Sequence, residues 1–429
     1  MCRFIHAEEN FFSPVPSSDM GILAVYLLAE SADPALTAQI ALRDKSVSDL
    51  RIAKAKKNPY LISRFVAGPS ANLKNHSSDV DKSVSLGLSL PLIDEPLDFD
   101  IKIEEMGVKR ASLQLEDYRQ AHLLMVAESY FDVLSAEQDL LSSSAEIESF
   151  SSQLEQATER LRVGVGTRVD VDQGRAQLDL SKVRLIKLES DFENAKANLG
   201  RLIGMSIGAL KNLSPDAQVG SLTTEDFSSE DFVESHPTVL VARNMLMEAR
   251  LRVEKAKSFE KLSWSLNSDL NVSSGGDGSR RKGSVSLALE IPIFVGDRTN
   301  AAIASASNYL ANMRAELEQE RRLVRYNIEV ADRNLSSGKR SLEALLFAIR
   351  SAESRVEATE AAYTVGSGDL IEVLNAKKDL IASQRDFEKA RYQQVLNDLR
   401  KAASLGLLNI DYLKEIDRQL VTLESNKSL

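Results

Sequence analysis

The side chains best suited to nucleophilic or metal chemistry are few and widely separated. Cys2 is the only cysteine of the sequence, which excludes an internal disulfide framework and a thiolate zinc site. The histidines show no ligand spacing, and no glycine-rich phosphate loop follows a strand pattern. Because no nucleophile, base and metal ligand converge, we expect no catalytic residue, no metal site, no cofactor and no enzyme activity. The four histidines are His6, His76, His122 and His236.

The composition is that of a folded acidic protein. The 429 residues are 43% hydrophobic and 27% charged, which is unlike a disordered chain. The net charge of −10 argues against phosphate neutralisation, which requires clustered Lys and Arg. We therefore expect no nucleic-acid partner.

The longest apolar run near the start, residues 21–29, has two interpretations. It could be the core of a signal peptide, but Glu8, Glu9 and Asp19 precede it where such peptides carry positive charge. The favoured alternative is a helix that Asp19 caps, with one apolar face. We therefore treat residues 1–20 as an N-terminal extension with no clear signal peptide. The expected helix face consists of Ile22, Val25, Tyr26 and Ala29.

The elements that would position any functional residue are long helices in a duplicated chain. Prolines are absent from 97–214 and 293–429, and both stretches are rich in helix-forming residues. The pattern at 84–92 returns at 285–293, and Val163-Gly164 returns about 202 residues later as Val365-Gly366. We expect a first repeat over 21–204, an inter-repeat segment over 205–230, a second repeat over 231–406 and a C-terminal tail over 407–429. The long helices would occupy about 100–203 and 297–404.

Each repeat also carries two expected strands, at about 59–68 and 83–92 in the first and about 262–272 and 283–293 in the second. The last three alternate apolar residues with Ser, Gly, Asn or Asp. Arg64 makes the first strand less regular. The length and pattern fit lipid-facing strands. They fit a soluble antiparallel sheet on a core equally well.

The helices carry seven-residue repeats that are typical of coiled coils. One seam of the first repeat runs from Val171 to Leu199, and a second begins with the small residues Gly174 and Ser181. Each helical hairpin turns at a glycine-containing loop, at 163–167 and 365–369. If the four strands lie in a membrane, chains must combine, because four strands cannot close a barrel and open edges in lipid leave backbone groups unsatisfied. The small polar face favours a wider, water-filled assembly.

These features, in this order, resemble the TolC-type outer membrane efflux proteins, the trimeric channel-tunnels of Gram-negative bacteria. The resemblance rests on residues 363–376 (YTVGSGDLIEVLNA) with 378–380 (KDL), and on the partner segment 162–172 (RVGVGTRVDVD). Val25-Tyr26, residues 32–34 and Leu405-Gly406 extend it over about 20–415.

The resemblance implies a mainly helical fold with a β-barrel portion. Each chain would contribute four strands to a homotrimeric twelve-stranded barrel, above an α-helical coiled-coil tunnel through the periplasm. It also implies a location in the outer membrane, in contact with its lipid, and export of drugs or polypeptides. The partners would be a periplasmic adaptor and an inner-membrane transporter, either an ABC transporter or a proton-driven pump.

The resemblance further implies where the periplasmic entrance closes. The first acid of the entrance ring would be Glu372, and the family's second acid is replaced by Asn375. The hairpin latch would join Tyr363 to Asp170, while the family's latching arginine falls on Gly368 and leaves Arg168 as a candidate substitute. As helix N-terminal acids, Asp170 and Glu372 would also be favoured by the helix dipole.

A soluble coiled-coil scaffold with a small β-sheet is the alternative function. It would need no export, but it does not explain duplicated strands with small polar faces. The sequence does not identify the cargo or the pump.

Overall fold

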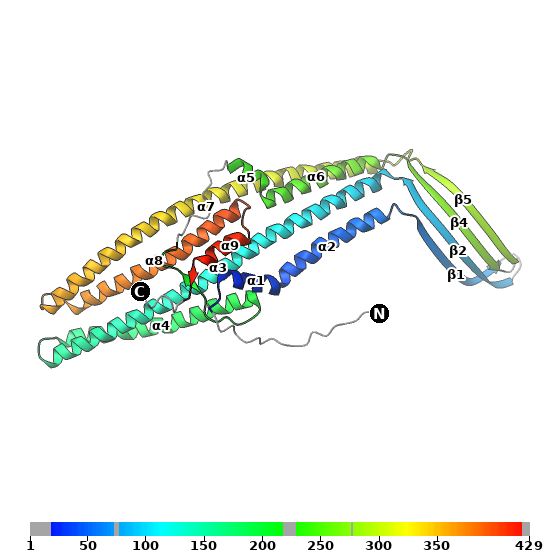
Figure 1. The fold of residues 1–429 in the computed structure, drawn as a ribbon. Helices are drawn as coiled ribbons and strands as arrows, with labels where there is room; N and C mark the ends of the chain where they lie inside the picture. Colours follow the sequence, from blue (N-terminus) through cyan, green and yellow to red (C-terminus); the bar gives the residue numbers. More distant parts are fainter. Residues whose placement is uncertain (1–18, 73–76, 218–228, 276–277, 423–429) are drawn as a thin grey trace. The chain divides into compact units, whose positions relative to one another are not determined.

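The computed structural model describes residues 19–72, 77–217, 229–275 and 278–422 (Figure 1). Within this part of the chain, long helices dominate and four strands form one large sheet. In chain order the elements are α1 (Ile22–Ala32), α2 (Pro34–Ala55), β1 (Tyr60–Asn72), β2 (Ser77–Ile93), α3 (Glu95–Arg162), α4 (Arg168–Ile203), β3 (Asn212–Leu213), α5 (Ser229–Ser235), α6 (Pro237–Ser258), β4 (Ser263–Gly275), β5 (Gly278–Glu290), α7 (Arg298–Thr364), α8 (Leu370–Ser404), α9 (Ile410–Arg418) and β6 (Leu420–Val421).

The chain forms two compact units, and each takes segments from both expected repeats. The unit we call the hairpin unit comprises residues 1–36, 118–236 and 324–429, and the sheet unit comprises 37–117 and 237–323. The boundaries of the two compact units therefore differ from the expected boundaries of the repeats, and the repeat boundaries stay a prediction. The expected extension, inter-repeat segment and tail lie partly outside the described residues, at 1–18, 218–228 and 423–429.

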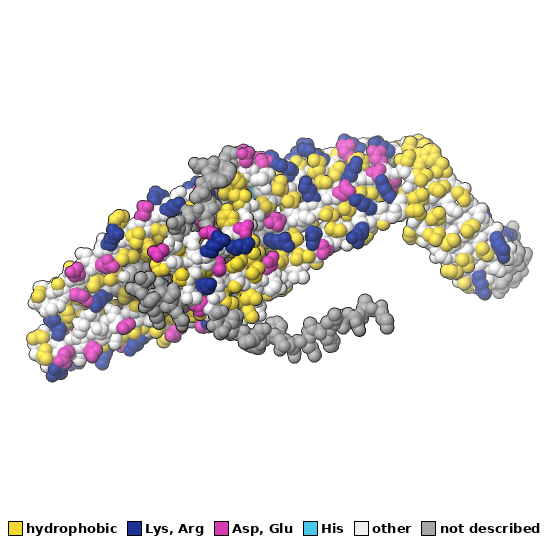
Figure 2. Space-filling model, in the orientation of Figure 1, with side chains coloured by type: hydrophobic (Ala, Val, Ile, Leu, Met, Phe, Trp, Pro, Cys, Tyr) yellow, Lys and Arg dark blue, Asp and Glu magenta, His cyan; other side chains and the backbone are white. Residues whose placement is uncertain are grey.

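The sheet of the sheet unit is antiparallel, with strand order β1-β2-β4-β5. Its register places apolar positions of neighbouring strands on one face: Phe65 pairs with Val84, and Val84 with Val272. The opposite face carries small polar residues, for example Ser85 opposite Asn271. Hydrophobic side chains gather over the sheet face seen in Figure 2, and few charged ones lie among them.

The strands start or end at different residues from those the alternation indicated. β1, β2 and β4 are longer than expected, and their loops are correspondingly shorter. β5 ends at Glu290, before Pro292, whereas we expected it to reach 293. Since proline has no N–H to donate to a ladder, the pairing of β5 stops there. β2 passes Pro91 only with a register shift between Pro91 and Ile93.

The helices begin where proline and local polar groups favour a start. Pro34 and Pro237 are the first residues of α2 and α6, where a missing N–H costs no helical hydrogen bond. The apolar face predicted for α1 is correct, because Ile22, Val25, Tyr26 and Ala29 are buried. The cap predicted for α1 was wrong: its N-cap is Gly21, and the side chain that bonds its first turn is Asp417 of α9, whose Oδ1 accepts from the Leu23 N–H at 3.3 Å.

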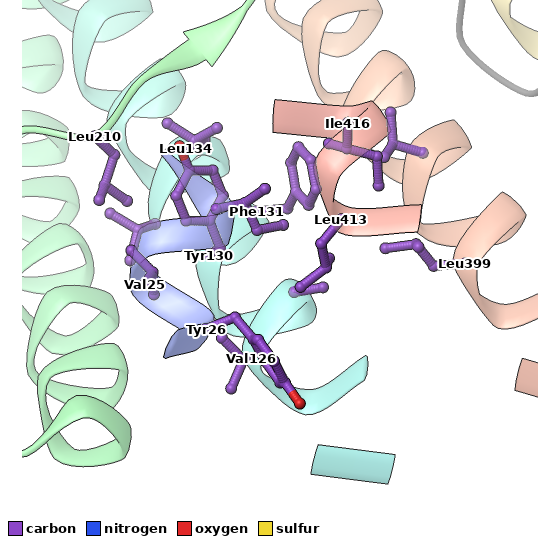
Figure 3. Packing of buried hydrophobic residues seen from close by; sticks show 14 of the residues in the cluster. Val25, Tyr26, Val126, Tyr130, Phe131, Leu134, Leu210, Leu399, Leu413 and Ile416 are labelled. Carbon is purple, nitrogen blue, oxygen red and sulfur yellow. The ribbon is translucent and has the colours of Figure 1, made fainter. Parts of the chain in front are cut away.

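In the hairpin unit, a hydrophobic core joins α1, α3, α4, α8 and α9 (Figure 3). Tyr130 and Phe131 of α3 are among its most deeply buried side chains. The Tyr130 hydroxyl donates to the carbonyls of Met20 (3.1 Å) and Lys211 (2.6 Å), two segments far apart in sequence. Tyr392 of α8 similarly donates to Oδ1 of Asn212 at 2.8 Å.

The C-terminal region adds structure that the sequence patterns did not predict. Where we expected a tail, α9 packs Leu413 and Ile416 into the core. β6 then pairs with β3 of the inter-repeat segment, with Leu213 opposite Leu420. The end of the chain thus ties the segment around 205–217 to the helices. Among the helices described, none has the combination of length and apolar composition that a membrane span needs.

Candidate functional site

The two helical hairpins of the hairpin unit turn with the same backbone geometry. In the first, the N–H groups of Val165 and Gly166 donate to the Arg160 carbonyl at 3.0 and 2.9 Å. In the second, the N–H groups of Ser367 and Gly368 donate to the Ala362 carbonyl at 2.9 and 3.1 Å. Each turn contains a glycine with positive φ: 83° at Gly164 and 81° at Gly366. Glycine adopts this left-handed region without steric cost.

Close packing inside the first hairpin follows the predicted small-residue seam. A Cβ added at Gly174 of α4 would lie 3.4 Å from the Leu154 side chain of α3. Two helical turns later, Ser181 donates to the buried Glu146 of α3 at 3.3 Å, and Arg184 donates to the same carboxylate at 2.9 Å. Small residues therefore allow the helices to approach closely near the turn. Farther from the turn, the buried Glu146 pairs with the exposed Arg184.

A buried hydrophobic cluster near the turns, which we call the tip cluster, joins the two hairpins to each other. Its members come from α3, α4, α7 and α8, so neither hairpin forms it alone. Leu370 and Val373 in the first turn of α8 are completely buried in it. The tip cluster consists of Phe150, Ala157, Leu178, Tyr363, Leu370, Val373 and Leu374.

Tyr363 lies in the tip cluster with 8% of its surface exposed, but it does not form the expected hydrogen bond to Asp170. Its hydroxyl is buried and has no hydrogen-bond partner in the described part of the chain. Burial raises the pKa of the Tyr363 hydroxyl above its usual value, the nearby Asp170 raises it further, and Arg160 opposes the rise. Asp170 therefore acts on Tyr363 through charge and not through a hydrogen bond.

The Asp170 carboxylate is instead engaged in the N-terminal cap of α4. The Thr167 side chain accepts from the Asp170 N–H at 3.1 Å, and the Asp170 carboxylate accepts from the Thr167 N–H at 3.1 Å. This reciprocal arrangement is a capping box, which satisfies two free N–H groups of the helix start. The helix-terminal role anticipated for Asp170 is thus present in the structure.

The cation that meets Tyr363 is Arg160, a residue that the sequence reasoning did not single out. Its guanidinium carbon lies 4.5 Å from the centre of the Tyr363 ring, within the range of a cation–π interaction. Arg160 belongs to the end of α3 in the first hairpin, and Tyr363 to the end of α7 in the second. No spacing rule marks Arg160, because its counterpart 202 residues later is Ala362.

The two other candidates for the latch lie outside this contact. Arg168 is exposed and approaches Asp172 of its own helix at 3.7 Å, so it does not reach the second hairpin. Gly368 closes the second turn, where an added Cβ would come within 3.1 Å of the Ala362 Cβ. The cation in contact with Tyr363 is therefore Arg160, and neither of the two predicted positions supplies one.

Glu372 and Asn375 are exposed side chains on α8, three residues apart and outside the tip cluster. Glu372 lies in the first turn, where the helix dipole favours an acid. Farther along the second hairpin, Lys377 pairs with Glu360 at 2.6 Å and Arg355 pairs with Asp379 at 2.5 Å. The structure thus separates a solvent-facing acidic position from the buried contact between hairpins.

Comparison with known proteins identifies the family of this architecture. The model of the family described as "Outer membrane efflux protein" matches residues 25–205 and 233–406. The chain belongs to the outer membrane efflux protein family. The recognition made from residues 162–172 and 363–380 is therefore confirmed, and so is the predicted location in the outer membrane.

Relatives of known name match almost the whole chain. It is 25% identical over 410 residues to the outer membrane protein TolC of Vibrio cholerae, covering 92% of this chain and 93% of that one. It is 24% identical over 424 residues to the alkaline protease secretion protein AprF of Pseudomonas aeruginosa, covering 94% and 86% of the two chains.

Solved structures show the same fold. A crystal structure of CusC has a TM-score of 0.83 at 19% identity and covers 90% of this chain and 92% of its own. The Campylobacter jejuni CmeC outer membrane channel has a TM-score of 0.80 at 15% identity, covering 97% and 95%. The predicted mainly helical fold with a smaller β portion is confirmed at this level.

Proposed function

We propose that three copies of this chain form an export channel that spans the outer membrane and extends into the periplasm. The observation that carries the proposal is the two-faced sheet of the sheet unit. Its apolar face is exposed in the single chain: Phe65 and Val285 are 75% and 74% exposed. A contiguous apolar surface of this kind marks a contact with lipid or with another protein.

The number of copies follows from the edges of the sheet. β1 and β5 form its two edges, and in lipid their free backbone groups need partners. Pairing β5 of one copy with β1 of the next closes the sheet, with eight strands from two copies or twelve from three. The small polar face, with Ser85 and Asn271, favours the larger barrel with a watery interior.

The contacts between the hairpins would close the periplasmic entrance. Opening requires the hairpins to separate, which exposes the tip cluster to water and breaks the contact between Arg160 and Tyr363. We propose that Arg160 takes the place of the arginine that the family carries at the position of Gly368. Three copies of Glu372 would form an acidic ring at the entrance, with Asn375 contributing no charge.

A channel of this type needs an energy source on the inner membrane. We propose that a periplasmic adaptor connects it to an inner-membrane transporter, of either the ABC or the proton-driven class. The names of its relatives support either a polypeptide or a small cargo, since they include a protease secretion protein and a cation efflux system protein. The choice between polypeptide and small-molecule cargo follows from the pump, not from this chain.

The test is conductance of the purified protein in planar bilayers, combined with its mass in detergent. We expect a mass three times the 47.3 kDa of one chain, and a small conductance that rises when the tip cluster is disrupted. Val373→Asp places a charge in that cluster and should open the channel, while Val365→Asp, at a turn residue that is 79% exposed, should not. A monomeric protein without conductance would refute the proposal.

A further inference from the structure

A cleft of about 550 Å³ lies between α3 and α6 in the sheet unit. This volume is within the range of small-molecule sites. Its apolar surface comes from long flexible side chains, which adapt to an irregular hydrocarbon ligand. These side chains are Met106, Leu113, Leu240, Met247 and Leu251.

The polar residues that line the cleft are predominantly cationic. They are Lys102, Lys109 and Arg243, with Glu105 as the single acid and Asn244 as the neutral member. Lys102 contacts the ring of Phe99 at 5.1 Å but has no carboxylate partner among the described residues, and neither has Lys109.

The acids around the cleft already have other cations. Glu105 pairs with Lys54 of α2 at 3.1 Å, and Asp100 pairs with Lys255 of α6 at 2.5 Å. The buried Glu248 is held by Arg110 and Arg252. The positive charge of Lys102 and Lys109 is therefore not neutralised by the protein, and it is complementary to an anionic group.

Asn244 adds an unsatisfied acceptor to the cleft. It is only 6% exposed, and its Oδ1 has no hydrogen-bond donor in the described part of the chain. A buried carbonyl without a donor costs roughly 1–3 kcal/mol, so a ligand that supplies an N–H or O–H here is favoured.

We propose that this cleft binds a glycerophospholipid whose headgroup carries an O–H or N–H donor. An acyl chain would lie on the methionine and leucine surface, the phosphate would face Lys102 and Lys109, and the headgroup would donate to Oδ1 of Asn244. The source of the lipid rests on the proposed function, which places the sheet across the outer membrane. α3 begins two residues after β2 ends, so Lys102 lies about 10 Å along α3 from its start beside the sheet.

The experiment is native mass spectrometry of the full-length protein in detergent, titrated with phosphatidylglycerol or phosphatidylcholine. Phosphatidylglycerol has hydroxyl donors and the phosphatidylcholine headgroup has none, so wild-type protein should bind the former more tightly. Lys109→Glu should weaken phosphatidylglycerol binding by at least about tenfold, since it reverses a charge that faces the phosphate. Lys187→Glu, the same change at an exposed residue of α4, is the matched control and should leave binding unchanged.

Asn244→Leu tests the acceptor separately and should reduce the preference for phosphatidylglycerol over phosphatidylcholine, while the part of that preference due to the net negative charge of phosphatidylglycerol remains. Equal binding to wild type and Lys109→Glu would overturn the proposal. So would inorganic phosphate competing as well as lipid, which would indicate a simple anion site. A change of oligomeric mass in Lys109→Glu would identify a second copy as the occupant instead. A trimer that conducts but binds no lipid would refute this inference and leave the proposed function standing.

Discussion

Replacing Arg160 by methionine should open the entrance, because it removes the cation above the Tyr363 ring and keeps the apolar stem. The contact joins the first hairpin to the second, with 4.5 Å between the guanidinium carbon and the ring centre. Nε of Arg160 is buried without a hydrogen-bond partner in the described residues, so the ring is its main partner. The two side chains are therefore coupled only while the hairpins are together.

The expected size follows from this burial. Cation–π contacts contribute about 0.5–1 kcal/mol when exposed and about 2 kcal/mol when desolvated. With Tyr363 only 8% exposed, we take about 1–2 kcal/mol per chain. If three copies open together, the equilibrium shifts by about 3–6 kcal/mol, which is roughly a 10²- to 10⁴-fold increase in the open population.

Planar-bilayer recording measures this population directly, as the open probability of single channels. Arg162→Met is the matched control, since Arg162 lies two residues away on the same helix but is exposed and pairs with Glu159 at 2.5 Å. Arg160→Lys should give an intermediate result, because lysine keeps the charge and loses the planar stacking. An open probability in Arg160→Met equal to that of wild type would refute the assignment of Arg160 to the latch.

Three further predictions use the same protein. Glu372→Gln should weaken cation selectivity and block by multivalent cations, while Asn375→Asp should deepen the block. If neither substitution changes the ion selectivity, the acidic ring lies elsewhere. Tyr363→Phe should change closure little at neutral pH, because its hydroxyl has no hydrogen-bond partner in the described chain. The pKa of Tyr363 is raised in the closed state, so closure favours the protonated hydroxyl. Closure should therefore be intact below pH 10.0, the usual tyrosine pKa, and should weaken as the pH rises from there through the raised pKa. Tyr363→Phe should lose this pH dependence of the open probability. Tyr130→Phe leaves the Lys211 carbonyl without its hydroxyl donor, while the Met20 carbonyl keeps the Lys211 N–H at 3.1 Å; it should lower the free energy of unfolding by about 1–3 kcal/mol, measured by denaturant titration.

Local patterns in the sequence were sufficient to predict much of the fold. The alternation around Val84 and Val272 predicted which residues share a sheet face, and the register now pairs them. Gly164 and Gly366 marked both turns, because only glycine adopts the required φ readily. α9 and the pairing of β3 with β6 were not predicted, since a nine-residue helix and two-residue strands are too short for a clear periodic signal.

The candidate site was predicted less well, because its chemistry depends on contacts between distant segments. The resemblance directed attention to Tyr363 and Asp170, but the sequence could not reveal that the Asp170 carboxylate caps its own helix. Nor could it place Arg160 over Tyr363, since the two are separated by about 200 residues and by no repeated pattern. A cation–π contact between two hairpins has no local signature.

The most direct test of the central claim asks which face of the sheet meets lipid. In a Cys2→Ser background, single cysteines are introduced at Ser85 and Ser286 on the polar face, and at Leu88 and Leu289 on the apolar face. A membrane-impermeant thiol reagent is then applied to the trimer in lipid vesicles. A membrane-spanning channel predicts labelling at the two serine positions and protection at the two leucine positions. Equal labelling at all four would contradict the membrane channel and favour a soluble sheet.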